Sequence, residues 1–250
     1  MDEEITEQIT ITPHEKQEFD EFKRQKRLTE ARAKIRKIEL NLTQVQADRA
    51  ALKRAVKEGE KSGIGGICVQ PYLVRPCKEY LGLHSPIAVV ASLSLSGSDV
   101  TDIKVKQVKR AIKDGADIVE VTACIAAVKE GSFGYIKKEF KKLRKAAKKT
   151  ALRINVEAPL LTSQELSRIC SLACECQISC IRAASDLYGG GADEEDIKII
   201  QAAVKDRAAI KADGVESAAA MASLTDIGVS VIGSSAALTL ALNILSSAER

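Results

Sequence analysis

The sequence alternates eight short apolar runs with longer amphipathic stretches, and this alternation narrows the choice of fold more than any other feature. We predict eight strands: Ile38 to Leu42, Gly66 to Val69, Ile87 to Ala91, Ile118 to Val121, Leu152 to Val156, Ile178 to Ala183, Ala208 to Lys211 and Val229 to Ile232. The intervening helical stretches are Gln44 to Glu60, Ile103 to Lys113, Tyr135 to Lys148, Ser163 to Glu175, Glu194 to Lys205, Ser217 to Ile227 and Ser235 to Ser246. Eight strands in alternation with helices predict a (β/α)8 TIM barrel, with a doubly wound open sheet as the alternative.

A charged helical segment precedes the first predicted strand. Thr12, Pro13 and Glu15 form a helix start in which Thr12 caps the helix and Glu15 completes a capping box. The apolar positions that follow make only a thin seam: Phe19, Phe22, Leu28, Ala31, Ile35 and Ile38. We therefore divide the chain into a helical extension, residues 1–36, and a barrel domain, residues 37–250. The extension is expected to lie on the barrel as a solvated helix, with a partner-binding arm as the alternative.

Composition excludes several classes of function. The chain has 38 Lys and Arg against 34 Asp and Glu, and the surplus of +4 is too small to indicate nucleic-acid binding by itself. Aromatic residues make up only 3% of the chain, so base stacking has no support. No apolar run approaches the roughly 18 residues that span a bilayer, and the acidic N-terminus does not resemble a signal peptide. We expect a cytoplasmic protein with no nucleic-acid partner and no membrane attachment.

The seven cysteines are expected to be reduced thiols, because their number is odd and no secretory signal is present. Four of them cluster in the sequence without a Cys-x-x-Cys pair or a nearby histidine: Cys170, Cys174, Cys176 and Cys180. This spacing indicates small buried side chains, and we expect no metal site.

Four motifs resemble the deoxyribose-phosphate aldolase family: Ile67-Cys68-Val69-Gln70-Pro71, Gly115-Ala116-Asp117-Ile118-Val119-Glu120-Val121, Ile210-Lys211-Ala212 and Ile232-Gly233-Ser234-Ser235. They follow the order and spacing of the family, and the resemblance runs from about Ile38 to the C-terminus. It implies a (β/α)8 barrel that makes and breaks a carbon–carbon bond through a lysine Schiff base, without a cofactor. The implied substrate is a small carbonyl compound or a phosphorylated metabolite.

The resemblance also marks where this chain departs from the family. Arg182 stands at the position of the Schiff-base lysine on the sixth strand, and a guanidinium group cannot form an imine. Arg153 replaces another family lysine, and Glu120 stands at the aspartate that relays protons. Lys211 keeps the seventh-strand lysine, which in the family depresses the pKa of the nucleophile.

The implied phosphate site is retained in part by four residues: Gly233, Ser234, Ser235 and Gly214. Backbone N–H groups before a helix can still bind an anion. However, Glu216 stands at the arginine of the family turn, and Asp186, beside Ser185, would repel a phosphoryl group. We assign Ser185 and Cys68 to the lining of the pocket.

Two roles for Lys211 remain open. Beside Arg182 in a partly dry barrel mouth, its amine form is favoured, so Lys211 can form the imine while Glu120 moves protons and Arg153 tunes the charge. Alternatively, Lys211 forms a structural salt bridge with Glu120 or Asp213. The first role predicts a divergent aldolase, a carbon–carbon lyase, and the second a silent barrel that binds a small anionic ligand or a protein. A third hypothesis is a structural subunit that assembles through its N-terminal helix, and we expect a homo-oligomer.

Overall fold

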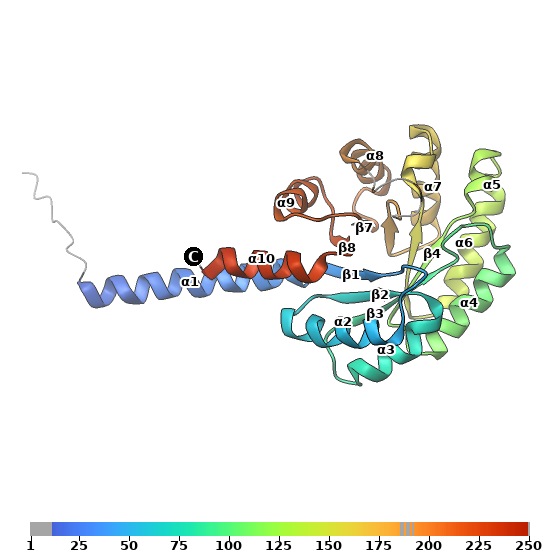
Figure 1. Cartoon of the computed structure of the whole chain (residues 1–250). Coiled ribbons are helices and arrows are strands. Elements are labelled where there is room, and N and C mark those ends of the chain that lie inside the picture. The colour runs from blue at the N-terminus through green and yellow to red at the C-terminus, as the bar shows by residue number, and fades with distance from the viewer. Residues whose placement is uncertain (1–11, 186–187, 189–190, 192, 250) are drawn as a thin grey trace, which may run out of the picture.

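The computed structural model describes residues 12–185, 188, 191 and 193–249 (Figure 1). Its eight parallel strands close into a barrel in sequence order, from β1 round to β8, so the predicted (β/α)8 TIM barrel is confirmed. The strands are β1 Ile38–Leu42, β2 Gly66–Val69, β3 Ala88–Leu93, β4 Ile118–Thr122, β5 Ala151–Asn155, β6 Cys180–Arg182, β7 Ala209–Ala212 and β8 Val231–Ser234.

Helices cover the outside of the barrel (Figure 1). They are α1 Pro13–Ile35, α2 Arg49–Ser62, α3 Val74–Leu81, α4 Thr101–Lys113, α5 Ile125–Lys129, α6 Phe133–Ala147, α7 Ser163–Glu175, α8 Glu194–Val204, α9 Ala218–Asp226 and α10 Ala237–Glu249, with short 3-10 turns η1 Pro71–Leu73 and η2 Ala158–Leu160. We did not predict α3 and α5, because α3 contains Pro76 and α5 is too short for a helical period to be visible. Helix α2 begins later than predicted, because the Asp48 side chain caps it by accepting from the N–H of Ala51 (2.7 Å).

The strands place polar side chains inside the barrel by their alternation. In β1, Ile38 and Leu40 belong to the apolar core between the strands and the outer helices. Glu39 and Asn41, one position on in each case, point to the interior, where they contact Arg153 and Asp213. Because successive side chains of a strand face opposite sides, one strand supplies both the core and the site.

Within the described part of the chain, helix α1 packs against the rest of the molecule through its second half. Leu28 and Ala31 pack against Ala248 of α10, and Arg27 Nε donates to the carbonyl oxygen of Ala248 (3.2 Å). Residues 13–27 are exposed, and the N-terminal part of α1 projects beyond the end of α10 (Figure 1). The predicted capping box at Thr12 is present. The expectation of a helix lying on the barrel is therefore right for the second half of α1 and wrong for the first.

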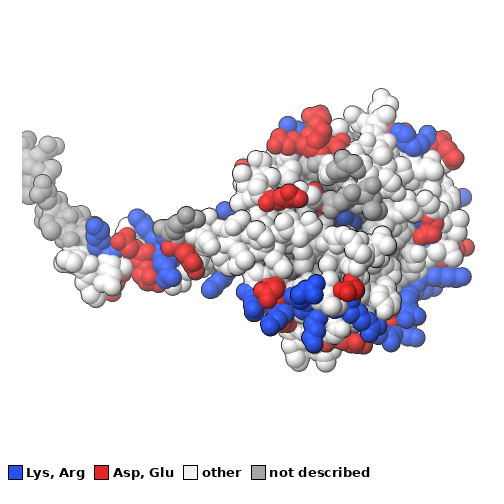
Figure 2. All heavy atoms as spheres, viewed as in Figure 1, with Lys and Arg blue, Asp and Glu red and all other residues white. Residues whose placement is uncertain are grey.

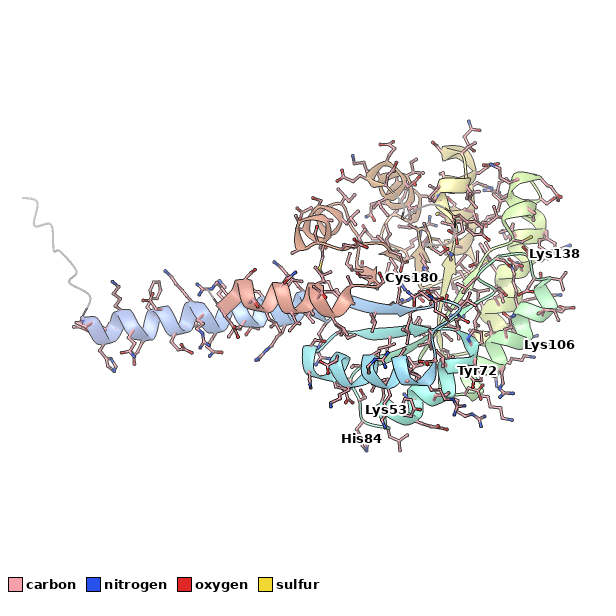
Figure 3. The ribbon with its side chains drawn as sticks, in the orientation of Figure 1. Lys53, Tyr72, His84, Lys106, Lys138 and Cys180 are labelled. Carbon is pink, nitrogen blue, oxygen red and sulfur yellow. The ribbon has the colours of Figure 1, made fainter. Side chains whose placement is uncertain are left out.

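The outer surface of the barrel is strongly charged. Lys and Arg gather along the edge that α2, α3 and α4 form in Figure 2, and Lys138 of α6 points away from the barrel in Figure 3. Helix α6 buries Ile136, Phe140 and Leu143 and leaves most of its lysines exposed, as expected for an outer helix. Among the described residues, no helix combines the length and the apolar character needed to cross a membrane.

Candidate active site

Strands β4 to β7 bring four of the predicted residues together inside the barrel. Glu120 lies beside Arg153 in the register of β4 and β5, and Arg182 lies beside Lys211 in the register of β6 and β7. All four side chains are buried, and Lys211 has no exposed surface. Parallel strands that close a barrel point their inward side chains to a common interior, so residues far apart in the sequence form one cluster.

Glu120 is the centre of this cluster, because its carboxylate contacts all three cations. Its Oε1 accepts from Arg182 (3.0 Å), and its Oε2 accepts from Lys211 Nζ (3.0 Å) and from Arg153 (3.2 Å). Hydrogen bonds between ionised partners are stronger than those between neutral groups. A single carboxylate therefore ties strands β5, β6 and β7 to β4.

Two further carboxylates complete the network. Glu39 of β1 accepts from both terminal nitrogens of Arg153 (2.8 Å each) and lies 2.9 Å from Lys211 Nζ. Asp213, just after β7, accepts from Arg182 Nε (2.6 Å) and lies 3.8 Å from Lys211 Nζ. The ammonium group of Lys211 is thus surrounded by three carboxylates.

The complete set is electrically balanced. Three carboxylates meet three cations, so the formal charge of the cluster is zero: Glu39, Glu120, Asp213, Arg153, Arg182 and Lys211. We call these six residues the interior network. Charges are tolerated in a protein interior when they are paired and hydrogen-bonded, and each member here has an opposite charge within contact distance.

The surroundings of Lys211 correct one part of the sequence analysis. Burial by itself would lower the pKa of this amine, but Asp213, Glu120 and Glu39 raise the pKa of Lys211 above its ordinary value of 10.5. The first of the two roles left open for Lys211 assumed the opposite direction from the charge of Arg182, which is directed instead at Glu120 and Asp213. The salt bridges of the second role, with Glu120 and Asp213, are present. Lys211 is therefore an ammonium ion at neutral pH, and its amine form is disfavoured.

The pKa values of two acids of the network are lowered, whereas that of Lys211 is raised. Burial would raise the pKa of Glu120, but the charges of Lys211, Arg182 and Arg153 hold it well below its ordinary value of 4.5. The pKa of Glu39 is also lowered, because Lys211 and Arg153 outweigh the effect of burial. Both carboxylates are therefore ionised at neutral pH.

Cys68 lies against the network as a neutral thiol. Its Sγ is 3.7 Å from Oε1 of Glu120. Burial raises the pKa of Cys68, and also that of Cys180, to about 12. Since the thiolate is the nucleophilic form of cysteine, neither residue is a nucleophile at neutral pH.

Of the four residues predicted to bind phosphate, Gly233 lies close to a carboxylate of the chain itself. A Cβ atom at Gly233 would collide with Asp213 Oδ1, so glycine at this position permits the close approach of Asp213. Ser234 is buried, and its Oγ accepts from the N–H of Ala236 (3.0 Å) at the start of α10. Ser235 and Gly214 are exposed. An anion bound near Gly233 would meet the charge of Asp213.

Ser185, the other predicted lining residue, contacts a second internal carboxylate. Its backbone N–H donates to Glu157 (2.9 Å), its hydroxyl donates to the same carboxylate, and Asn155 Nδ2 also donates to Glu157 (2.7 Å). Glu157 is buried and has a left-handed backbone, with φ of 49°. The chain's own carboxylate therefore occupies these donors. Asp186, predicted to repel phosphate, lies outside the described residues.

Three residues of this region were not predicted from the sequence: Glu39, Asn41 and Glu157. A usable pattern exists for the first two, because Glu39 and Asn41 alternate with apolar residues in β1. Glu157 follows β5 in a backbone conformation that is rare for glutamate, and no sequence pattern indicated it. Asn41 Nδ2 donates to Asp213 (2.6 Å), which fixes the side of Asp213 opposite Arg182.

The cysteines and acids do not form a recognisable metal centre in the described part of the chain. No group of three or more His, Cys, Asp or Glu residues there is arranged to hold a metal ion. The four clustered cysteines are free thiols, and Cys174 is the one among them that is not fully buried.

Comparison with known proteins connects this barrel to a family. The model of the DeoC/LacD family of aldolases matches residues 30–166. The deoxyribose-phosphate aldolase of Clostridium botulinum (strain Loch Maree / Type A3) is 28% identical over 205 residues, which cover 81% of this chain and 96% of that protein. Deoxyribose-phosphate aldolase 1 of Mesoplasma florum is 30% identical over 178 residues, covering 71% and 80%.

Solved structures of aldolases share the fold. The aldolase QR15 superposes with a TM-score of 0.80 at 23% identity and covers 85% of this chain and 96% of its own. The deoxyribose phosphate aldolase of Aeropyrum pernix superposes with a TM-score of 0.77 at 18% identity, covering 90% and 97%. On the family match and the sequence identity together, the chain belongs to the DeoC/LacD family of aldolases.

Proposed function

We propose that this barrel of the aldolase family is catalytically silent, because the amine that imine chemistry needs is held in an ion network. One observation carries the proposal. Lys211 is fully buried, with its Nζ 2.9 Å from Glu39 and 3.0 Å from Glu120. An imine forms when a neutral amine attacks a carbonyl carbon, and an ammonium ion has no free electron pair for that attack. The raised pKa of Lys211 keeps it in the ammonium form.

Loss of the Lys211 proton would unbalance the interior. Three carboxylates would then face two guanidinium groups, and one buried negative charge would have no opposite charge to pair with. Removing one partner of a buried ion pair typically costs about 3–5 kcal/mol. A carbonyl substrate would also have to displace Glu39 or Glu120 to reach Nζ, since both contact it directly.

Arg182 gives the second argument. The family resemblance puts the Schiff-base lysine at this position, and arginine stays protonated at every physiological pH. The eight strands, all of which the structure describes, contain a single lysine, Lys211. No other strand lysine can therefore take over the role of nucleophile.

The interior does not favour an anionic ligand. Asp213 lies against Gly233, and Glu157 accepts from the N–H of Ser185, so carboxylates of the chain stand where a phosphate was predicted. Within the described residues, the buried side-chain atom without a hydrogen-bond partner is Asn41 Oδ1, an acceptor, which suits a donor group and not an anion. We therefore favour a protein over a small anion as the partner of the silent barrel.

The second candidate is a carbon–carbon lyase that uses Lys211. It is favoured by the direct contact between Lys211 Nζ and Glu120 Oε2 (3.0 Å), which brings a nucleophile and a proton carrier together. In this candidate, Glu120 moves protons, and Arg182 and Arg153 tune the charge of the site or hold an anionic group. Family membership also supports it.

Borohydride reduction in the presence of small aldehydes and ketones separates the two candidates. The reagent converts an imine on lysine into a stable amine, and mass spectrometry of peptides locates it. A silent barrel gives no adduct on Lys211 with any carbonyl compound. Slow alkylation of exposed Lys138 in the same sample serves as the internal control that the reagents are active.

An adduct on Lys211 that disappears in Lys211→Ala would overturn the silent barrel and support the lyase. Deoxyribose 5-phosphate belongs in the panel, because the relatives are named for this aldolase activity. Cleavage of this compound by the full chain, abolished by Lys211→Ala, would have the same meaning.

A further inference from the structure

Among the described residues, the first half of α1 has no apolar packing partner. Residues 13–27 are all exposed and make about 22 Å of helix at 1.5 Å per residue, with a hydrogen bond to α10 at their last residue, Arg27 (Figure 1). We call this segment the free half of α1. Isolated helices of this length are only marginally stable in water, so a partner for this segment would stabilise it.

One face of the free half carries a short heptad-like seam. Glu15, Phe19, Phe22 and Lys26 follow each other at spacings of four, three and four residues, which puts them on one side of the helix. The two rings are 55% and 66% exposed, although large apolar side chains are usually buried when a surface can cover them.

This seam does not face α10. The buried positions of α1 are Leu28, Ala31 and Ile35. At 3.6 residues per turn, Phe22 lies roughly half a turn around the helix from Ala31. A partner can therefore cover the two phenylalanines without disturbing the contact between α1 and α10.

We propose that the free half of α1 pairs in antiparallel orientation with the free half of α1 in a second copy of this chain. The order of residues along the seam selects this partner. With the two-fold axis between Asp20 and Glu21, Phe19 faces Phe22 of the second copy, and Glu15 faces its Lys26. Parallel pairing would instead put Glu15 against Glu15 and Lys26 against Lys26, which is unfavourable.

The distribution of charge along the whole segment agrees with this orientation. Before Phe22 the free half carries four acidic residues and one lysine, and after Phe22 it carries four basic residues: Glu15, Lys16, Glu18, Asp20 and Glu21, then Lys23, Arg24, Lys26 and Arg27. Antiparallel pairing lays the acidic part of each helix over the basic part of the other. A two-fold axis then makes the same contacts twice, as in most homodimers.

In the proposed register, the two barrel domains of the dimer do not collide. Residue 13 of one copy comes opposite residue 28 of the other, which is ten positions before β1 begins at Ile38. The two barrels then lie at opposite ends of the helix pair. One helix from each copy makes a small interface, so we expect a reversible dimer whose share falls on dilution.

Sedimentation equilibrium of the full chain over a range of concentrations tests the proposal. We expect a monomer–dimer equilibrium, and Phe19→Lys/Phe22→Lys is expected to shift it to monomer. The matched control is Val45→Lys, which changes an apolar residue that is 91% exposed and lies outside α1. A full chain that stays monomeric, or an assembly that the double variant does not alter, would overturn the proposal.

Charge reversal tests the orientation independently of the rings. Glu15→Lys alone and Lys26→Glu alone each put like charges opposite one another in a homodimer, so each is expected to be monomeric. A mixture of the two restores opposite charges at both positions and is expected to form a heterodimer. Because Glu15 also takes part in the capping box with Thr12, far-UV circular dichroism must show that α1 is retained. No heterodimer from two helical variants would reject the antiparallel register.

Discussion

Opposite charges are interleaved in the barrel interior, whereas they are segregated along the free half of α1. In the interior network, Glu120 alone contacts Arg153, Arg182 and Lys211, and no member is without an opposite charge. Along the free half of α1, acids come first and bases follow, and nearly all of them are in contact with water.

This difference decides what each region can still do. Interleaved and buried charges are satisfied by one another, so little attraction is left for a ligand, and the amine of Lys211 is kept protonated. Segregated and exposed charges interact only weakly within their own helix, as in the pair of Glu21 and Arg24 (3.4 Å). They remain available to a partner with the complementary order. The three predictions below test this contrast.

Removal of the central acid should have the largest effect. Glu120→Ala leaves three buried cations with two acids, and we expect a loss of about 3–5 kcal/mol in the free energy of unfolding, measured by urea denaturation. The matched control is Glu58→Ala on α2, which breaks an exposed pair with Lys61 and should cost less than about 0.5 kcal/mol. Equal costs for the two variants would contradict a network that depends on burial.

The second largest effect should be a loss of stability at low pH, because protonation of the carboxylates weakens the interior network. The pKa values of Glu120 and Glu39 are lower in the folded chain than their ordinary value of 4.5, so the unfolded chain binds more protons below that pH. The stability that these two carboxylates contribute is therefore complete above about pH 4.5 and falls as the pH decreases further, by up to about 1.4 kcal/mol per pH unit for each carboxylate.

Urea midpoints between pH 7 and pH 3 measure this loss. Glu120→Gln removes one of these titrating groups, so the pH dependence should be weaker in that variant. A wild-type stability that stays constant down to pH 3 would show that these carboxylates do not ionise as their surroundings require.

The smallest expected effects are those of substitutions in α1, and they should differ between its packed half and its free half. Ile35 is 1% exposed, and Ile35→Val removes one methylene from the core, which should cost about 0.5–1.5 kcal/mol. Phe22→Ala removes far more, but from a ring that is 66% exposed, so its cost should stay within about 0.5 kcal/mol. Thermal unfolding at concentrations where the chain is monomeric compares them. A larger cost for Phe22→Ala would mean that the free half packs within the monomer.

Much of the fold could be predicted from the sequence, because a local pattern of apolar residues indicates each strand. The eight strands were found with boundaries a few residues from those observed, and the capping box at Thr12 marked the start of α1. The short helices α3 and α5 could not be predicted, since a turn or two of helix leaves no period to detect.

The candidate site was predicted in part. The residues of β4 to β7 came from the family resemblance, and the structure brings them into contact. Glu39 could have been predicted from the alternation in β1, but nothing local indicates that it reaches Arg153 and Lys211 across the barrel. Glu157 depends on one unusual backbone angle, which no pattern of residue types encodes.

The sequence by itself determined the barrel, its helical extension and the identity of the charged residues on the strands, because periodicity and residue type are local properties. Only the tertiary structure decided the state of Lys211. A pKa depends on every charge within a few ångströms, and closure of the barrel brings Glu39 from the first strand and Asp213 from the seventh to the same amine. For the same reason, only the structure separated the half of α1 that is packed from the half that is free.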